Sequence, residues 1–509
     1  RDLDDNFGAS RQFRRAIQID PGLPEAHSNQ GIALFDISAF DEASLSYRRA
    51  LILRPDYPQA LNNLGNSLRL LGDVTLAHQC FKRALSIDPS YEEALNNEGI
   101  VEYERSNHAA SLIAYHRAIS LRPGYAEAYN NLGISHYTLG NFKEAESALL
   151  RALVLRPSYP EALNNLGAAF RNQGRFREAH DAYRSAIKLS TSYAEAHWND
   201  GLLHLLEGNY EEGWKGYEWR FKNSHLKYQQ SPSPKKIWHG ETPIYGQTIL
   251  LYAEQGHGDT IQFFRYALSL SQRGARVILE VQPELNEFLA SQSPAITVIP
   301  RGSRLPEHEW VASLMSLPHA FGTTLDTIPS KKPYLTPDPR VLARWKAILG
   351  PKKRIRIGLV PSGNPEHEED HWRSIGWKRF LPLLDLPADF YCLQKSPSKQ
   401  DLSLINHHPE VKNLSQAMIN YSDTAAITQL MDIVISVDTS VAHLAAALGR
   451  ETWILLAWIP DWRWLSEISY SPWYSTAIIF RQDSCRSWDP VMAKVRDKLT
   501  RHTEKYERL

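Results

Sequence analysis

Asp438, Thr439 and Ser440 form a polar turn between an apolar run and a helix of small residues. The apolar run, residues 433–437, is rich in β-branched residues and predicts a buried parallel strand. Asp, Thr and Ser are residue types that cap helices, and the amides at a helix start also bind anions. The turn is therefore either a simple cap or part of a phosphate site. His443, one helical turn later, is either a packed histidine or a ligand contact.

A second polar loop contains Gly256, Gly258 and Asp259, and it also lies between a strand-like run and a helix. Its two glycines allow the backbone to approach a ligand closely. Asp259 is either the N-cap of the following helix or a carboxylate that accepts a proton in catalysis. The loop lacks the GK[ST] ending of a P-loop and does not predict that kind of nucleotide site.

Three further segments with charged or aromatic residues follow predicted strands. The loop 362–374 carries Arg373, which could contact an anion, although a solvated surface loop has the same composition. Lys395 comes directly after the strand 390–393 and could meet a diphosphate. The run DWRW at 461–464 could hold a sugar or a base by stacking and by its guanidinium, or it could simply anchor the domain.

The elements that must position these loops are two successive series of strands and helices. One series begins with TILLYA at Thr248 and the other with IRIGLV at Ile355, so the pattern predicts two Rossmann-like α/β lobes that face each other across a cleft. We assign residues 246–350 to the first lobe and residues 351–509, with an amphipathic final helix, to the second. Residues 222–245, which contain Ser-Pro-Ser-Pro, are expected to be a linker.

The first 221 residues carry a 34-residue period that predicts a helical solenoid. The period is that of the tetratricopeptide repeat, in which each unit has two helices and small residues allow them to pack closely. We expect about six units, the first of them truncated. Proline and glycine both follow the step, at Pro21, Pro55, Pro89, Pro123 and Pro157 and at Gly31, Gly65, Gly99, Gly133, Gly167 and Gly201.

An Asn-Asn pair recurs one helical turn before the repeat glycine in four of these units. An amide offers both a donor and an acceptor, so asparagines on the concave face could hold a peptide backbone. The alternative is that the pair packs between helices. The asparagines predicted to bind peptide are Asn63, Asn97, Asn131 and Asn165.

Composition excludes several classes of protein. The 509 residues carry a formal net charge of zero, so no nucleic-acid or anionic-membrane partner is indicated, and no run of about 18 apolar residues predicts a membrane span. Cys80, Cys392 and Cys485 lie far apart, which favours a reducing, cytoplasmic location. His367 and His371 lie in a proline-containing loop, and no metal site is predicted.

Taken together, the polar loops of the second half resemble those of the family 9 glycosyltransferases, the heptosyltransferase-type group of the GT-B fold. The resemblance is nearest to the bacterial subgroup with tetratricopeptide repeats in front, and the architecture is similar to that of the protein O-GlcNAc transferases. The motifs that carry it are GWKGYEWRF (213–221), EQGHGDTIQFFRY (254–266), SGNPEHEEDHWRS (362–374), LQK (393–395), VDTSVAHLAAALG (437–449) and DWRW (461–464).

The resemblance implies an inverting, metal-independent transferase without a cofactor, whose substrate is a nucleotide-sugar. An inverting transfer needs a base for the acceptor hydroxyl and stabilisation of the leaving diphosphate. Asp259 matches the family's base. The residues that match its donor-binding positions are Asp438, Thr439, Ser440 and His443 of the D-T-[GS]-x-x-H turn, together with Lys395, Arg373 and Gly363.

The remaining residues of these motifs are expected near the acceptor or the sugar. They are Gln255, His257, Gly258, Trp462 and Arg463. The predicted function is thus transfer of a sugar to a protein, peptide or glycan that the solenoid recruits. Two alternatives remain: an interaction scaffold with an inactive GT-B region, and an O-GlcNAc-type transferase acting on protein Ser or Thr.

Overall fold

The computed structural model describes residues 3–223, 231–329, 332–365 and 370–507. The chain divides into two compact units, Arg1–Tyr193 and Ala194–Leu509, called unit 1 and unit 2 below. The last helical pair of the predicted solenoid, α12 (Ala194–Leu206) and α13 (Tyr210–Tyr217), therefore groups with the α/β part of the chain.

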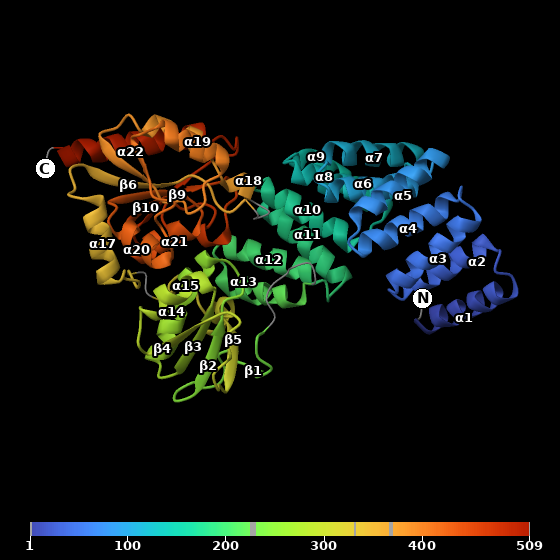
Figure 1. Ribbon diagram of the computed structural model, residues 1–509, viewed down its shortest axis with the longest axis horizontal. Helices are drawn as coiled ribbons and strands as arrows, with labels where there is room; N and C mark the ends of the chain where they lie inside the picture. The colour runs from blue at the N-terminus through green and yellow to red at the C-terminus, as the bar shows by residue number, and fades with distance from the viewer. Residues whose placement is uncertain (1–2, 224–230, 330–331, 366–369, 508–509) are drawn as a thin grey trace. The chain divides into compact units, whose positions relative to one another are not determined.

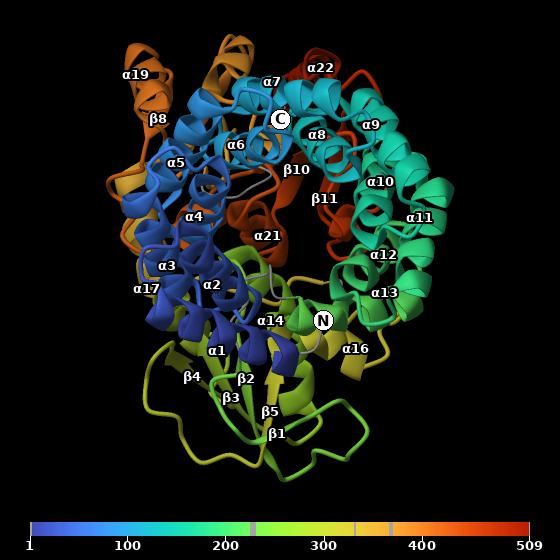
Figure 2. The ribbon, with the colours of Figure 1, turned by 90° about the vertical axis from the view of Figure 1, so that its right-hand side faces the viewer.

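Unit 1 consists of antiparallel helix pairs that repeat in chain order. Figure 2 shows these helices, blue to teal, stacked side by side along a curve. Prolines begin three of them because proline is accepted at the first helical position. The helices are α1 Leu3–Ile19, α2 Pro24–Asp36, α3 Phe40–Leu53, α4 Pro58–Leu70, α5 Val74–Ile87, α6 Glu92–Glu104, α7 His108–Leu121, α8 Ala126–Thr138, α9 Phe142–Leu155, α10 Pro160–Asn172 and α11 Phe176–Leu189.

The repeat glycines have a steric reason. A Cβ atom at Gly99 would lie 2.5 Å from Cε1 of Tyr115, a ring that is buried between the two helices of the repeat. The same contact joins Gly31 to Tyr47, and an aliphatic side chain, Leu149, meets Gly133 in a later repeat. In unit 1 glycine thus keeps the period because each pair of helices closes over a large side chain, whereas Gly201 of α12 meets the backbone of Gly216.

Replacing Gly99 by alanine is expected to destabilise the α6–α7 pair by about 1–2 kcal/mol, because overpacking costs more than the helix propensity that alanine gains. Hydrogen exchange of the amides in 92–121 should become about tenfold faster. Gly124→Ala is the control, since nothing lies within 4 Å of the added methyl group. Equal protection in the two variants would contradict this explanation of the glycine period.

Unit 2 contains two parallel sheets, and Figure 1 labels strands of both. The sheet of the first lobe, the N-lobe, has the order β1-β5-β2-β3-β4. Its strands are β1 Lys236–Ile237, β2 Thr248–Tyr252, β3 Arg276–Val281, β4 Ile296–Pro300 and β5 Trp310–Ser313. β1 lies in the segment expected to be a linker; it pairs in parallel with β5, so part of that segment is the edge of the sheet.

The second sheet, that of the C-lobe, has the order β11-β10-β9-β6-β7-β8. Its strands are β6 Ile355–Val360, β7 Ala388–Cys392, β8 Val411–Asn413, β9 Ile433–Val437, β10 Glu451–Leu456 and β11 Ala477–Arg481. Numbered along the lobe, this is the 3-2-1-4-5-6 order of doubly wound nucleotide-binding folds. The chain reverses direction across the sheet between β6 and β9, and ligands of such folds bind at the carboxyl ends of the strands at that point.

Helices cover both faces of the C-lobe sheet. Ile435 of β9 packs in a core that includes Val495 and Leu499 of the final helix, α22 (Asp489–Glu507). Val434, the neighbouring residue, packs on the other face with Ala445 of α21 (Ser440–Ala447). This alternation follows from the two-residue period of a strand, and burial on both faces explains the uninterrupted apolar run. The other helices of eight or more residues in unit 2 are α14 His257–Gln272, α15 Pro283–Ala290, α17 Pro339–Leu349, α19 Lys399–His407 and α20 Tyr421–Gln429.

Candidate functional site

The turn after β9 leaves the start of α21 without a side-chain cap. Thr439 occupies the N-cap position, but its hydroxyl pairs with that of Ser436 at 2.9 Å. The Ser440 hydroxyl accepts a hydrogen bond from the Tyr421 hydroxyl at 2.9 Å. The first amides of a helix have no partner inside the helix. Among the described residues no side chain caps α21, so its positive end is available to an anion.

Asp438 faces His443 and does not cap the helix. Its Oδ1 lies 3.6 Å from Nε2 of His443, whose Nδ1 is 3.0 Å from the Tyr474 hydroxyl. The imidazole is buried and stacks on Trp464 at a centroid distance of 5.2 Å. Burial opposes ionisation of Asp438, but the hydrogen bond and charge of His443, with Arg373 nearby, outweigh it and lower the pKa of the carboxyl to about 2.

Acid should therefore weaken unit 2 through Asp438. Its folded pKa of about 2 is below the ordinary 3.8, so ionised Asp438 stabilises the fold above pH 3.8, and the gain is lost as the pH falls toward 2. The loss amounts to roughly 2 kcal/mol. All tryptophans of the chain lie at Trp198 or beyond, so their fluorescence reports unit 2. Asp438→Asn should flatten the pH dependence of urea unfolding by this amount; identical curves would contradict the prediction.

Each oxygen of the Asp259 carboxylate has a protein partner in the structure. Oδ2 accepts the Gly256 amide hydrogen at 2.9 Å and so closes the first turn of α14. Oδ1 accepts from the Arg463 guanidinium at 2.5 Å. Beside it, a Cβ atom at Gly258 would lie 2.9 Å from Cδ2 of His443. The first turns of α14 and α21, one from each lobe, therefore meet, and only glycine fits at the contact.

Arg463 joins the two lobes through Asp259 and Gln262 of the N-lobe. It donates from Nε to Oε1 of Gln262 on α14 at 2.9 Å, and from Nη1 to Asp461 at 2.8 Å, besides binding Asp259. The guanidinium lies over the Trp462 ring, 4.3 Å from its centroid. Although burial disfavours a charged guanidinium, the two carboxylates raise the pKa of Arg463 above its usual value. Arg463 thus links the C-lobe to the N-lobe by an ion pair and a hydrogen bond.

The residues expected near the acceptor have protein partners. Trp462 is buried in an aromatic cluster and meets Trp214 of α13 edge to face at 5.2 Å. Gln255 donates to the Tyr217 hydroxyl at 2.7 Å. His257 stacks on Tyr421 of the C-lobe at 5.3 Å. The structure therefore brings these side chains to the junction of the lobes, and their contact with an acceptor or a sugar stays a prediction.

The expected donor-side residues lie at the carboxyl edge of the C-lobe sheet, and Arg373 is close enough to Asp438 to lower its pKa. Arg373 donates from Nε to Oδ1 of Asp370 at 3.0 Å, and Gly363 packs beneath this pair. Lys395 is exposed, and its ammonium donates to the carbonyl oxygens of Met418 and Ile419. No contact joins Lys395 to the 438–440 turn among the described residues. Residues 366–369 of the loop, His367 included, lie outside the described residues.

Sequence reasoning missed two residues of this site, Gln262 and Tyr474, and it named Trp464 within the 461–464 run without its contact to Asp438. Gln262 is buried, and its Nε2 has no hydrogen-bond partner among the described residues. It is three residues from Asp259 in the same predicted helix, and residues at this spacing lie on one helical face. Trp464 flanks Asp438 and helps to lower its pKa. Tyr474, which contacts His443, is 31 positions away and has no sequence signal.

The recurrent asparagines of unit 1 bond to one another between repeats. Nδ2 of Asn97 donates to Oδ1 of Asn62 at 2.8 Å. Asn131 and Asn165 make the same bond to Asn96 and Asn130, at 3.0 and 2.9 Å. These bonds agree with the alternative that the asparagines pack between helices, because their amide nitrogens already have partners in the neighbouring repeat. Peptide binding by the partly exposed asparagines remains a prediction.

Comparison with known proteins supports the helical part. Family models of the tetratricopeptide repeat match residues 58–91 and 126–192, so the chain contains a tetratricopeptide-repeat array. Protein FlbA of Caulobacter vibrioides is 23% identical over 310 residues, 55% of this chain and 51% of that protein. The chain thus spans about half the length of this curated relative.

Two solved structures are similar to part of this chain. MamA is 25% identical, with a TM-score of 0.29, and the match covers 32% of this chain and 96% of MamA. YrrB, described as a TPR protein with an unusual peptide-binding site, is 21% identical, with a TM-score of 0.31 over 37% of this chain and 97% of its own. Within the described residues, no helix has both the length and the apolar character needed to cross a membrane.

Proposed function

We propose that unit 2 is a GT-B glycosyltransferase domain resembling family 9, and that it transfers a sugar from a nucleotide-sugar to an acceptor recruited by the tetratricopeptide repeats. The observation that carries the proposal is the uncapped start of α21, placed where the C-lobe sheet reverses its strand order. Such a position suits the diphosphate of a nucleotide. The three cysteines, each unpaired, suit a reducing compartment, and we place the protein in the cytoplasm.

The charges around the turn support diphosphate binding. The first turn of α14 meets that of α21, so two positive helix ends converge there. Asp438 offsets part of this charge but is itself held by His443, with Arg373 nearby. Helix amides and Arg373 can stabilise a leaving diphosphate without a metal ion.

Asp259 is the proposed base, and its present hydrogen bonds limit how it can accept a proton. Arg463 and the Gly256 amide occupy both carboxylate oxygens. For Asp259 to take the acceptor hydroxyl proton, one of its oxygens must accept from the hydroxyl, either beside its present partner or after Arg463 has released it. Arg463 has Asp461 as a second carboxylate partner, so its charge stays compensated when that contact opens.

A transfer assay with UDP-, GDP- and ADP-sugars tests this role. Wild-type protein should hydrolyse or transfer at least one donor, and Asp259→Asn should reduce the rate about 10²–10⁴-fold while leaving nucleotide binding intact. Mass shifts on co-expressed proteins would identify a protein Ser or Thr acceptor. An Asp259→Asn variant as active as wild type would remove Asp259 from the mechanism.

A second candidate function is an interaction scaffold, in which unit 2 no longer catalyses transfer. The observation that favours it is that both Asp259 oxygens have protein partners, the Gly256 amide and Arg463. Capping α14 and joining the two lobes would explain the presence of Asp259 without catalysis. This function predicts no donor turnover and no affinity for any nucleoside diphosphate. Those two measurements separate it from the transferase.

A further inference from the structure

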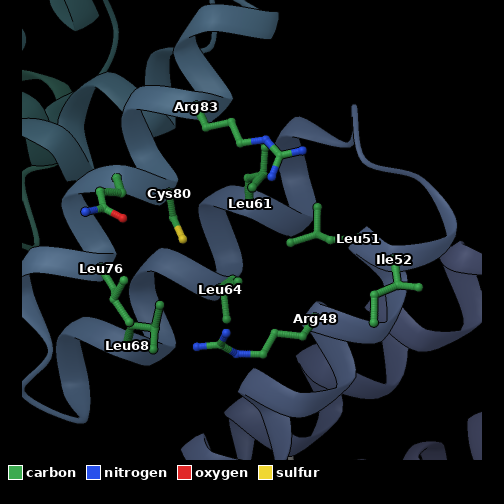
Figure 3. A pocket seen from close by; sticks show the side chains of 10 residues that line it. Arg48, Leu51, Ile52, Leu61, Leu64, Leu68, Leu76, Cys80 and Arg83 are labelled. Carbon is green, nitrogen blue, oxygen red and sulfur yellow. The ribbon is translucent and has the colours of Figure 1, made fainter.

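Unit 1 has an apolar groove between α3 and α5, with α4 as its floor (Figure 3). Its volume is about 480 Å³. Leu61, Leu64 and Leu68 of α4 line the floor. They recur at the three- and seven-residue spacing of one helical face, which differs from the face of Asn63. The groove is therefore separate from the asparagines predicted to bind peptide.

The walls of the groove expose large apolar side chains. Ile52 of α3 is 69% exposed and Leu76 of α5 is 38% exposed. Apolar side chains that gather at a concave surface gain free energy when a partner covers them, whereas single exposed ones need no explanation. Here the two exposed side chains belong to one hollow, whose leucine floor is only 2–6% exposed.

The two charged residues that line this groove are both positive. Arg48 and Arg83 line it, and no carboxylate is among the lining residues. Arg83 donates to the Pro55 carbonyl at 2.8 Å, which holds its guanidinium at the rim. Arg48 is exposed and makes no hydrogen bond or ion pair in the described part of the chain. The groove thus offers two guanidinium groups to an acidic partner.

The repeat period shows that the fold does not require this surface. The position of Ile52 is occupied by Ser86 and Ser120 in the next two repeats. The position of Leu76 is occupied by Glu144 and Glu178 in later ones. Since those repeats have the same helices, packing of the array alone does not explain the apolar walls.

We infer that this groove binds an acidic amphipathic segment of a partner protein. Its apolar side chains would cover Ile52 and Leu76, while its carboxylates pair with Arg48 and Arg83. Charge complementarity and the apolar walls carry this assignment. The site is independent of the transferase proposal, because every residue in it belongs to unit 1.

The test uses the full chain and two labelled helical peptides in fluorescence anisotropy. One peptide has leucine at i, i+3, i+4 and i+7 with glutamate elsewhere, and the other replaces each glutamate by lysine. The acidic peptide should bind at least about tenfold more tightly, as expected for one or more charge-assisted hydrogen bonds. Equal binding of the two peptides, or no binding of the acidic one, would overturn the inference.

The repeats themselves provide variants that keep the fold. Ile52→Ser and Leu76→Glu introduce residues that the array already carries at equivalent positions, and each should weaken the acidic peptide about tenfold or more. Val154→Ser is the matched control, because Val154 occupies the position of Ile52 in a later repeat and is also 69% exposed. Circular dichroism should be unchanged in all three.

Two further outcomes would contradict the inference. One is that Ile52→Ser and Leu76→Glu bind the acidic peptide as wild type does, which would place binding elsewhere. The other is that wild-type protein self-associates in sedimentation equilibrium and Leu76→Glu does not. That result would make a second copy of this chain the occupant.

Discussion

Replacing Arg220 by methionine should destabilise unit 2 by about 3–5 kcal/mol. The side chains of Arg220 and Glu254 are both fully buried, and Nε donates to Oε1 of Glu254 at 2.8 Å. Removing the guanidinium leaves a carboxylate in the protein interior, and burial already raises the pKa of Glu254. Tryptophan fluorescence in urea at pH 7 measures the loss.

The double variant Arg220→Met/Glu254→Leu is the matched control. It removes the two fully buried charges, and Glu218, the second carboxylate partner of Arg220, is partly exposed to solvent. Most of the lost stability should therefore return, because a well-packed apolar pair can replace a buried ion pair. A double variant no more stable than the single one would show that Arg220 acts through its other contacts. Those include a hydrogen bond of 2.8 Å to the Ser316 hydroxyl. Either way, the pair fixes the segment that follows α13 against the N-lobe.

Thr439→Asp should reduce affinity for a nucleoside diphosphate by about a hundredfold or more while leaving α21 at least as stable. Aspartate is a better N-cap than threonine and favours the positive end of the helix. The same negative charge opposes a diphosphate bound there, and like charges at close range cost several kcal/mol. Affinity and stability should therefore change in opposite directions, which a merely damaged protein would not show.

Thr439→Asn is the control for this prediction. It caps the helix with a side chain of similar shape and no charge, so its affinity should stay within a few-fold of wild type. Calorimetric titration with UDP, GDP and ADP gives the affinities, and thermal unfolding gives the stabilities. Equal affinities of the Asp and Asn variants would exclude the start of α21 as the diphosphate site.

The helical repeats and most strands could be predicted from the sequence, because the spacing of their apolar residues appears within a short stretch of chain. The run 433–437 predicts β9, and the strand is found at Ile433–Val437. The 34-residue step predicts the helix pairs of unit 1, and the family models confirm the repeat. The edge strand β1 was not predicted, because two residues carry no detectable period and their pairing depends on distant β5.

Side-chain partners far apart in sequence could not be predicted. The sequence predicts Asp259 as a cap or a base. It does not predict the ion pair with Arg463, which belongs to the other lobe. Lys395 follows its strand as expected, yet its ammonium binds two carbonyl oxygens near the start of α20. The sequence indicates which residue types lie at strand ends, whereas the partner that each one selects depends on how the lobes pack.

The most direct test of the central claim is a structure of the chain with a bound nucleoside diphosphate. We expect the diphosphate to lie over the start of α21, with its oxygens near the amides of 440–442 and within reach of Arg373. The opposing loop with Asp259 should face the same space. A diphosphate bound elsewhere in unit 2, or no bound nucleotide at saturating concentration, would contradict the proposed donor site.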